Sequence, residues 1–320
     1  MKKINEFEIV TDKNSNYKIF LNVMKYRTPH LHLDYEIAFI MTGSMDLIYE
    51  ENDVYHLKAG DFMCINPYQI HEFRADDYVR LLFLQINPVF FKNIYPQIEN
   101  LEFTSPVVSR PDPSDAFSYE AYDSAKKYIF SLALNYMEMR GDYELKCAGE
   151  LNLLFYDLLS LCPHRNVSHQ ERAYVQNRAT RMRSVGDYIE EHLEEKILLS
   201  DIAEREHLTL SYMSHFFKDN FHMTFQEYLT TLRCERARSL MLTTDLSLLD
   251  ISLSCGFSDP KYFKSGFLKQ YGLTPRDYRR DFGKQKLSGQ QNSMLTTQQF
   301  FSRQTSLVLL RQYLDENYEI

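Results

Sequence analysis

A duplicated segment in the last third of the chain constrains the fold more than any other feature of the sequence. Residues 199–203, with the sequence LSDIA, return as residues 248–252, LLDIS, at an offset of 49. Further along, residues 222–228 match residues 272–278 at an offset of 50, so a one-residue slip falls in the intervening turn. This pattern indicates that one supersecondary unit occurs twice.

Each copy has the sequence pattern of a helix-turn-helix unit. A short helix opened by a capping serine or a Leu-Asp pair is followed by a tight turn and by a second helix with polar and aromatic faces. In such a unit the first helix braces the second, whose outward residues enter the major groove of DNA. The aromatic residues expected to pack inward are Phe216, Phe217, Phe263 and Phe267. The residues expected to face DNA are Ser211, Tyr212, Ser214, His215 and Lys218 in the first copy, and Lys261, Lys264 and Ser265 in the second.

The two copies are joined by a segment with helical periodicity. Apolar residues recur through residues 225–242, and arginines are interspersed among them. One continuous helix of this length would extend roughly 27 Å, close to the roughly 34 Å of one DNA turn, so a single chain would reach two successive major grooves. Arg233 on this helix is a candidate contact to phosphate.

Charge is distributed unevenly along the 320 residues, whose net charge is −8. Residues 1–160 hold 15 basic and 24 acidic residues, whereas residues 161–183 hold five arginines and one glutamate. Residues 233–286 hold 11 basic and six acidic residues. Positive charge is thus concentrated beside the candidate DNA-reading helices, while the overall balance argues against a nonspecific nucleic-acid coat.

The residues around the two copies resemble the AraC/XylS family of transcriptional regulators. The resemblance covers about residues 184–282 and rests on an ordered set of motifs: Ile202-Ala203, Phe217-Lys218, Ile251, Cys255-Gly256-Phe257-Ser258-Asp259-Pro260, Tyr262-Phe263, Phe267 and Gly272-Leu273-Thr274-Pro275-Arg276-Asp277-Tyr278-Arg279. It implies a regulator, expected to be an activator, that binds double-stranded promoter DNA and contacts RNA polymerase. In the second unit Ser265, Gly266 and Leu268 replace the more usual basic, apolar and basic residues, so we expect the first unit to dominate specificity.

Two domains are expected from the length. Between residues 17 and 87, runs rich in Ile, Val, Phe and Tyr alternate with turn signals, which predicts a β-barrel or sandwich that the resemblance makes cupin-like. Apolar stripes predict a helical hairpin at about residues 121–137 and 145–161. The predicted fold class is α+β. It comprises a barrel with its hairpin over residues 1–162, a linker over 163–183, an all-α domain with two helix-turn-helix units joined by a helix over 184–284, and a polar linker with a helical extension over 285–320.

The hairpin has two interpretations. Its apolar stripes either form the interface of a homodimer or pack against the barrel of the same chain. As an interface, it would use Tyr128, Leu132, Tyr136, Leu154 and Leu158. The role of the extension over residues 287–320 also has alternatives. It docks on its own chain, extends a dimer surface or is disordered.

Four polar residues of the predicted barrel are spaced like metal ligands. His30, His32 and Glu36 lie at even spacing, so in an unbroken strand they share one face, and His71 follows after a turn. Three imidazoles and one carboxylate suit Zn, Mn or Fe, and the pattern resembles the cupin metal motifs, with Gln69 as a departure. We nevertheless predict no cofactor and no metal, because the resemblance implies a barrel that senses a small molecule, usually without metal.

The sensor interpretation assigns the same residues to an effector, of which a carbohydrate is one option. The expected effector-binding residues are His30, His32, Tyr35, Glu36, Tyr68 and His71. Alternatives remain open: a metal-dependent cupin enzyme fused to a DNA-binding domain, polar residues with only a structural role, or a ligand-free repressor or adaptor that acts through the C-terminal helix.

Other classes of protein are not favoured by the sequence. The first residues lack the apolar core of a signal peptide, and no stretch approaches the roughly 20 apolar residues that span a bilayer. We therefore expect a cytoplasmic protein without a membrane partner. Its five cysteines are scattered without a C-x-x-C pair, which predicts buried thiols rather than disulfides or a zinc knuckle.

Overall fold

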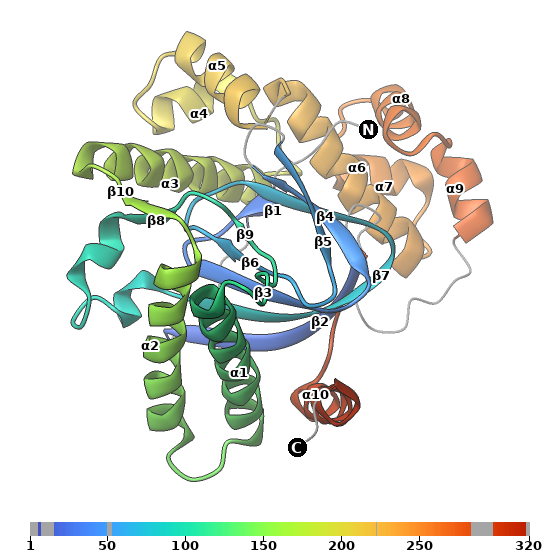
Figure 1. Ribbon diagram of the computed structural model, residues 1–320. Coiled ribbons are helices and arrows are strands. Elements are labelled where there is room, and N and C mark those ends of the chain that lie inside the picture. Colours follow the sequence, from blue (N-terminus) through green and yellow to red (C-terminus); the bar gives the residue numbers. More distant parts are fainter. Residues whose placement is uncertain (1–5, 8–15, 50–52, 222, 283–296, 318–320) are drawn as a thin grey trace. The chain divides into compact units, whose positions relative to one another are not determined.

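The computed structural model describes residues 6–7, 16–49, 53–221, 223–282 and 297–317. The chain divides into two compact units (Figure 1). The barrel unit comprises Glu8–Val175 together with Met294–Ile320, and the helical unit comprises Met1–Phe7 together with Gln176–Ser293. The barrel unit is therefore assembled from two stretches of sequence that lie on either side of residues 176–293 in the chain.

The barrel unit is built on antiparallel strands. These are β2 (Tyr17–Leu31), β3 (Tyr35–Thr42), β4 (Ser44–Tyr49), β5 (Asp53–Lys58), β6 (Phe62–Ile65), β7 (His71–Ile86), β8 (Leu101–Phe103), β9 (Val107–Val108), β10 (His164–Asn166) and β11 (Thr297–Phe300). The main sheet runs in the order β2-β7-β3-β6-β9, with β4 pairing both β5 and β7, and β11 pairing β2. A separate pair joins β10 to β8. The predicted α+β architecture with an N-terminal barrel is confirmed.

Strand β3 shows why this sheet needs apolar cover on both faces. Ile37 and Phe39 point into one core, which they share with helices, whereas Ala38 and Ile40 point into a second core enclosed by strands. All four side chains are at most 2% exposed. A strand with both faces buried reads as a nearly continuous apolar run, as residues 37–41 do.

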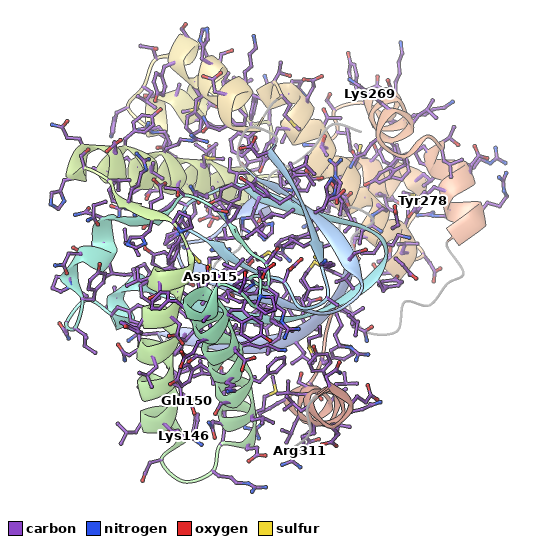
Figure 2. The ribbon with its side chains drawn as sticks, in the orientation of Figure 1. Asp115, Lys146, Glu150, Lys269, Tyr278 and Arg311 are labelled. Atoms are coloured by element: carbon purple, nitrogen blue, oxygen red, sulfur yellow. The ribbon has the colours of Figure 1, made fainter. Side chains whose placement is uncertain are left out.

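Helices of the barrel unit cover the first of these cores. They are α1 (Ala116–Glu138), α2 (Tyr143–Leu161) and α10 (Arg303–Asn317), with short 3₁₀ helices η1 (Pro88–Phe90) and η2 (Pro96–Asn100) between strands. Helices α1 and α2 form the predicted hairpin, and α10 packs beside α1 (Figure 1). Tyr313 of α10 stacks on Phe130 of α1 with ring centroids 5.4 Å apart, and Arg311 pairs with Glu138. Figure 2 labels Arg311 on α10. The C-terminal extension therefore includes a helix, and this helix packs against α1 of its own chain.

Three residues predicted at a dimer interface lie instead in this core. Leu132, Leu154 and Leu158 are 0% exposed, and Tyr128 and Tyr136 pack against the same cluster as partly buried neighbours. The prediction is wrong for the three leucines, because an apolar stripe identifies a buried face without identifying what buries it. Here the covering surface belongs to the same chain.

The helical unit contains β1 (Glu6–Phe7), most of α3 (His169–Glu191), α4 (Leu199–Arg205), α5 (Leu210–Phe221), α6 (Phe225–Thr243), α7 (Leu248–Ser254), α8 (Pro260–Tyr271) and α9 (Pro275–Phe282). The continuous helix predicted over residues 225–242 is α6. It supplies the centre of a core that also receives α7, α8 and α9. The four aromatic residues predicted to pack inward are all buried.

The structure differs from the predicted linker over residues 163–183. Residues 164–166 form β10, and residues 169–183 are the first part of α3. Ser168 begins this helix with a reciprocal cap, since Ser168 Oγ accepts from Glu171 N (3.2 Å) and Glu171 Oε2 accepts from Ser168 N (2.7 Å). Helix α3 crosses the boundary between the two units at residues 175 and 176.

Candidate DNA-binding surface and sensor site

The two helix-turn-helix units close their turns with equivalent backbone hydrogen bonds. Leu208 N donates to Ala203 O (2.8 Å) in the first unit, and Phe257 N donates to Ser252 O (3.1 Å) in the second. The two bonds are related by the same offset of 49 residues as the sequence repeat. The duplication is therefore structural as well as sequential.

The residue before each of these amides has a left-handed backbone. It is His207 in the first turn, with φ 56°, and Gly256 in the second, with φ 79°. The first turn accommodates a side chain, whereas the second does not. A Cβ atom at residue 256 would lie 2.4 Å from Leu193 O and 3.0 Å from Arg233 Nε. Glycine is therefore required in the second turn both for its φ angle and for this close approach.

Arg233, predicted to contact phosphate, is an internal brace. Its side chain is buried, Nε donates to Leu193 O (3.0 Å) and Nη2 donates to Glu195 O (2.6 Å). Burial lowers the pKa of its guanidinium group. This placement does not favour the predicted phosphate contact, because two donors already satisfy the carbonyl groups that follow α3.

Helices α5 and α8 each bury one face and leave the other open. Met213 and Phe217 of α5 are 0% exposed, as is Phe267 of α8, while Phe263 is 2% exposed. On the opposite faces, the predicted DNA-binding residues Ser211, Tyr212, His215, Lys218, Lys261, Lys264 and Ser265 are exposed, and Ser214 is half-buried. His215 Nδ1 lies 2.8 Å from Ser211 O and donates to it, so in the neutral ring Nε2 is the acceptor.

Two neighbours of these residues were missed by sequence reasoning. Arg181 of α3 donates from Nη1 to Tyr212 Oη (3.2 Å) and lies 5.7 Å from the centroid of that ring, which holds a cation beside α5. Tyr262 is 65% exposed on the outer face of α8. Tyr262 belongs to the Tyr262-Phe263 motif of the AraC/XylS resemblance, so the sequence did offer a reason to include it. Arg181 carried no local signal beyond its charge.

The unusual Gly266 is explained by helix packing. A Cβ atom there would lie 2.7 Å from Thr230 Cγ2 and 3.4 Å from Cys234 Sγ, both on α6. The glycine lowers the intrinsic helix propensity of α8, but it lets α8 approach α6 closely.

The predicted sensor residues lie at a turn between two strands. The histidines and the glutamate are not on one unbroken strand, because β2 ends at Leu31 and β3 begins at Tyr35. The turn nevertheless brings the two side chains together, with His32 Nε2 3.5 Å from Glu36 Oε2. His71, at the start of β7, places its Nε2 3.5 Å from Glu36 Oε1. The expectation of an unbroken strand is wrong, but three of the four candidate ligands converge.

The fourth candidate ligand, His30, uses its Nε2 atom to accept a hydrogen bond from Arg27. Arg27 donates from Nε to His30 Nε2 (2.9 Å), although the rings of His30 and His71 are only 4.1 Å apart between centroids. Burial, followed by the charge of Arg27, holds the pKa of His30 well below its usual value. His30 therefore supports the site rather than contributing a ligand atom.

The electrostatics of the group depend on burial. Burial lowers the pKa of His71, which favours its neutral form. Burial also opposes ionisation of Glu36, but the contacts with His32 and His71 outweigh it and hold the Glu36 pKa well below its usual value. Gln85 Nε2 donates to Glu36 Oε2 (2.8 Å) and fixes the carboxylate. The site therefore holds an ionised carboxylate inside the barrel unit.

The two predicted tyrosines have different places. Tyr35 points to the opposite face of β3 from Glu36, where its hydroxyl lies 2.9 Å from Leu101 O and 3.2 Å from Ile98 O. Because this side chain is buried in the helical core, it does not reach the site, and the prediction is wrong for Tyr35. Tyr68 is partly buried, and its backbone amide donates to His32 O (2.8 Å).

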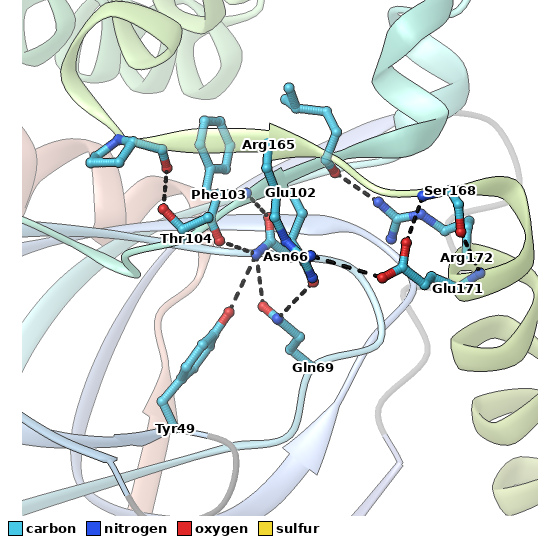
Figure 3. A network of polar contacts seen from close by, with 12 residues as sticks. Tyr49, Asn66, Gln69, Glu102, Phe103, Thr104, Arg165, Ser168, Glu171 and Arg172 are labelled. Atoms are coloured by element: carbon cyan, nitrogen blue, oxygen red, sulfur yellow. Dashed lines mark hydrogen bonds and ion pairs between the residues drawn. The ribbon is translucent and has the colours of Figure 1, made fainter.

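A polar network connects the loop before His71 to the start of α3 (Figure 3). Asn66 Nδ2 donates to Gln69 Oε1 (2.8 Å) and to Phe103 O (2.8 Å), and Gln69 Nε2 donates to Glu102 Oε1 (3.2 Å). Arg165 of β10 pairs with Glu102, with Nη2 2.7 Å from Oε2. The loop that carries His71 is thus tied to the two-stranded pair from which the chain continues into α3.

The same strand pair anchors α3 directly. Arg172 Nη2 donates to Leu101 O (2.7 Å) (Figure 3). Val167 N donates to Asn100 O (2.8 Å). Arg172 is 8% exposed. The first turn of α3 is therefore fixed on the barrel unit by buried polar contacts.

Comparison with known proteins matches both units to described families. The family model for an AraC-like ligand binding domain matches residues 19–124, and a helix-turn-helix domain model matches residues 202–281. Among curated proteins, the HTH-type transcriptional activator RhaS of Escherichia coli strain SE11 is 29% identical over 157 residues, which are 49% of this chain and 55% of that protein. RhaS of strain K12 / DH10B gives the same identity and coverage. The chain thus spans about half the length of these relatives.

Two solved structures illustrate the range of similarity. The C-terminal domain of the response regulator yesN from Fusobacterium nucleatum is 38% identical, with a TM-score of 0.30, over 31% of this chain and 98% of that one. ToxT from Vibrio cholerae O395 is 13% identical, with a TM-score of 0.39, over 84% of this chain and 99% of that one.

The matched segments coincide with the two sites. Residues 19–124 include the converging His32, Glu36 and His71, and residues 202–281 include both helix-turn-helix units. Among the described residues, every helix is too short or too polar to span a bilayer. With an AraC-like ligand binding domain followed by a double helix-turn-helix domain, the chain belongs to the AraC family of transcriptional regulators.

Proposed function

We propose that this chain is a sequence-specific DNA-binding activator whose barrel unit senses a small molecule. The observation that carries the proposal is the matched exposure of α5 and α8, each the second helix of a helix-turn-helix unit. The matched relatives are named as transcriptional activators, which supports the same role. We further propose promoter DNA and RNA polymerase as partners, the cytoplasm as location, and a sensor rather than a catalytic role for the barrel.

The two units are proposed to contribute unequally to DNA recognition. His215 presents an acceptor among small polar side chains on α5, which suits contacts to base edges. The outward face of α8 offers Lys261 and Lys264, which suit phosphate contacts. The first unit therefore supplies most of the sequence preference, and the second supplies mainly affinity.

Selection of bound sequences from random oligonucleotides, followed by fluorescence anisotropy over a range of salt concentrations, tests this assignment. His215→Ala should reduce preference for the selected site over random DNA, by about 1–3 kcal/mol if it reads one base. Lys261→Ala should weaken binding to both DNAs alike and reduce by about one the number of counterions released on binding, as measured from the salt dependence of the affinity. Lys92→Ala, on the barrel unit, is the matched control. Equal losses for both helix variants on both DNAs would refute the division of labour.

We propose that effector binding is communicated through the loop at residues 66–71. The loop carries His71, and the network of Asn66, Gln69, Glu102 and Arg165 joins it to the strands that hold the start of α3. Since α3 continues into the helical unit, a shift of this loop has a covalent route to the DNA-binding helices. Gln69→Leu should leave DNA affinity of the effector-free protein unchanged and reduce the effect of effector on it.

A homodimer is proposed to form through the outer face of α2. Leu145, Leu153 and Tyr156 are 78%, 48% and 68% exposed at helical spacing, whereas the inner face of α2 is already covered. This surface replaces the buried leucines as the candidate interface. Light scattering of a Leu153→Glu/Tyr156→Glu variant should show a monomer, with Tyr174→Glu as an exposed-tyrosine control. A wild-type monomer at micromolar concentration would contradict the proposal.

A further inference from the structure

The convergence of His32, Glu36 and His71 has the properties of a metal site. One donor atom from each residue lies within 4.8 Å of the others, and all three side chains are at most 2% exposed. Both imidazole nitrogens lie 3.5 Å from a carboxylate oxygen. Ligands about 2.0–2.2 Å from a tetrahedral zinc ion are separated by about 3.3–3.5 Å, so these separations fit two ligand pairs around one ion.

The hydrogen bonds around the imidazoles orient their other nitrogens toward the carboxylate. His32 Nδ1 lies 2.7 Å from Asp34 O, and His71 Nδ1 lies 3.0 Å from Gln69 O. A carbonyl oxygen only accepts, so each Nδ1 is the donor, and each neutral ring then has its lone pair on Nε2. This arrangement, with Nδ1–H on a backbone carbonyl and Nε2 facing the site, is the one that metal-binding histidines adopt.

When both rings are neutral, their Nε2 lone pairs face the carboxylate oxygens across the site. Glu36 Oε1 and His71 Nε2 are buried and have no hydrogen-bond partner within the part of the chain that the structure describes. A shared positive charge would satisfy both, and Gln85 holds the carboxylate in place for it. Arg27 Nε donates to His30 Nε2 (2.9 Å) beside the site.

We propose that the barrel unit binds one divalent transition-metal ion through His32 Nε2, the Glu36 carboxylate and His71 Nε2. Two imidazoles and one carboxylate favour Fe²⁺ or Zn²⁺ over Mg²⁺ or Ca²⁺, which prefer oxygen ligands. Three protein ligands leave coordination positions open. The proposal revises the expectation of a metal-free barrel, and it keeps three of the four ligands that the sequence suggested.

The open positions define the chemical class of effector. A small molecule with a carboxylate or neighbouring hydroxyl groups would coordinate the ion through oxygen while the protein holds the ion. This part of the inference rests on the proposed sensor role, whereas binding of the ion does not. His71 would link the ion to the loop at residues 66–71, since its Nδ1 is held by Gln69 O.

Metal binding is tested on the full chain without a histidine tag. Chelator-treated protein is titrated with Zn²⁺ by calorimetry, with anaerobic Fe²⁺ by equilibrium dialysis, and with Co²⁺ by absorption spectroscopy. We expect one equivalent per chain. The visible bands of Co²⁺ should appear without thiolate charge transfer, which separates this site from the five buried cysteines.

Matched variants locate the ion. Glu36→Gln and His71→Gln should abolish saturable binding, and Gln85→Leu, which removes a bond that positions the carboxylate, should weaken it by about 10–100-fold. His56→Gln is the control, because the His56 side chain is 82% exposed and pairs with Asp46 on another surface. Circular dichroism checks that each variant folds. Since the wild-type titrations need no variant, failure of one variant to fold leaves the proposal open to refutation.

Each outcome is decisive. Absence of saturable binding by wild-type protein, or unchanged binding by folded Glu36→Gln and His71→Gln, would overturn the inference. DNA binding measured by anisotropy on the same samples is independent of it. A protein that binds DNA but no metal overturns the inference and leaves the regulator role standing, while a protein that binds metal but no DNA supports the inference and contradicts that role.

Discussion

Substitution of Gly256 by alanine tests the packing of the second helix-turn-helix unit, and Gly272 provides its control. Both glycines lie in the helical unit with left-handed backbones, φ 79° and φ 71°. A Cβ atom at residue 272 would meet nothing within 4 Å, whereas at residue 256 it would lie 2.4 Å from Leu193 O. The two substitutions therefore share backbone strain and differ in steric overlap.

The magnitudes separate the two variants. A left-handed backbone destabilises the folded state by about 1–2 kcal/mol for a residue other than glycine. Alanine also lowers the entropy of the unfolded chain, which stabilises the folded state by about 0.4–1 kcal/mol. Gly272→Ala should thus destabilise the helical unit by about 1 kcal/mol. Overlap with a backbone carbonyl adds about 1–3 kcal/mol, so Gly256→Ala should cost about 2–4 kcal/mol.

The measurement must distinguish the helical unit from the barrel unit. The chain contains no tryptophan, so amide hydrogen exchange of peptides from α6, α7 and α8, followed by mass spectrometry, is the suitable assay. Peptides from β2 and β7 serve as an internal reference. Equal losses of opening free energy for the two variants, within about 0.5 kcal/mol, would refute the role given to the close approach.

Three further predictions follow from single buried contacts. Gly266→Ala should destabilise the helical unit by up to about 2 kcal/mol, because overlap of the new Cβ atom with Thr230 Cγ2 outweighs the gain in helix propensity. In a Thr230→Ser background, which removes that methyl group, the same substitution should be stabilising. Hydrogen exchange measures this change of sign. Burial raises the pKa of Asp157, which means that the ionised side chain destabilises the folded barrel unit. This destabilisation is complete above the folded-state pKa and disappears as the pH falls through the ordinary Asp range. Asp157→Asn should therefore raise the melting temperature at pH 7 and lose this advantage near pH 3. Leu310→Ala should destabilise the barrel unit by about 2–5 kcal/mol in urea unfolding, since Leu310 is 0% exposed; no change would show that α10 does not dock.

The DNA-binding half of the chain was predictable because its determinants are local. Caps, turn residues and helical periodicity lie within a few residues of the elements they specify, and the repeat doubled each signal. Arg233 shows the limit of such reasoning. Its partners are carbonyl groups about 40 residues earlier in the chain, so its charge alone suggested DNA.

The sensor site was predictable in composition but not in geometry. The spacing of His32 and Glu36 suggested a shared strand face, whereas a turn brings them together. The hydrogen bond from Arg27 to His30 lies where the pairing register of β2 with β7 shifts, which the spacing does not reveal. Similarly, the apolar stripes of the hairpin were correctly identified as buried, but α10 and the sheet that cover them come from distant parts of the chain.

The division of the barrel unit between two stretches of sequence has a consequence for synthesis. Strand β11 pairs with residues 22–26 of β2, and α10 covers α1, yet both leave the ribosome about 120 residues after the last residue of the first stretch. At about 5–20 residues per second, the barrel unit waits about 6–25 s for its last strand and helix while the helical unit is made. During that interval part of the β2 edge and one side of α1 lack these partners, so a nascent chain is most open to mispairing after its sensor strands have formed and before residues 297–317 have emerged.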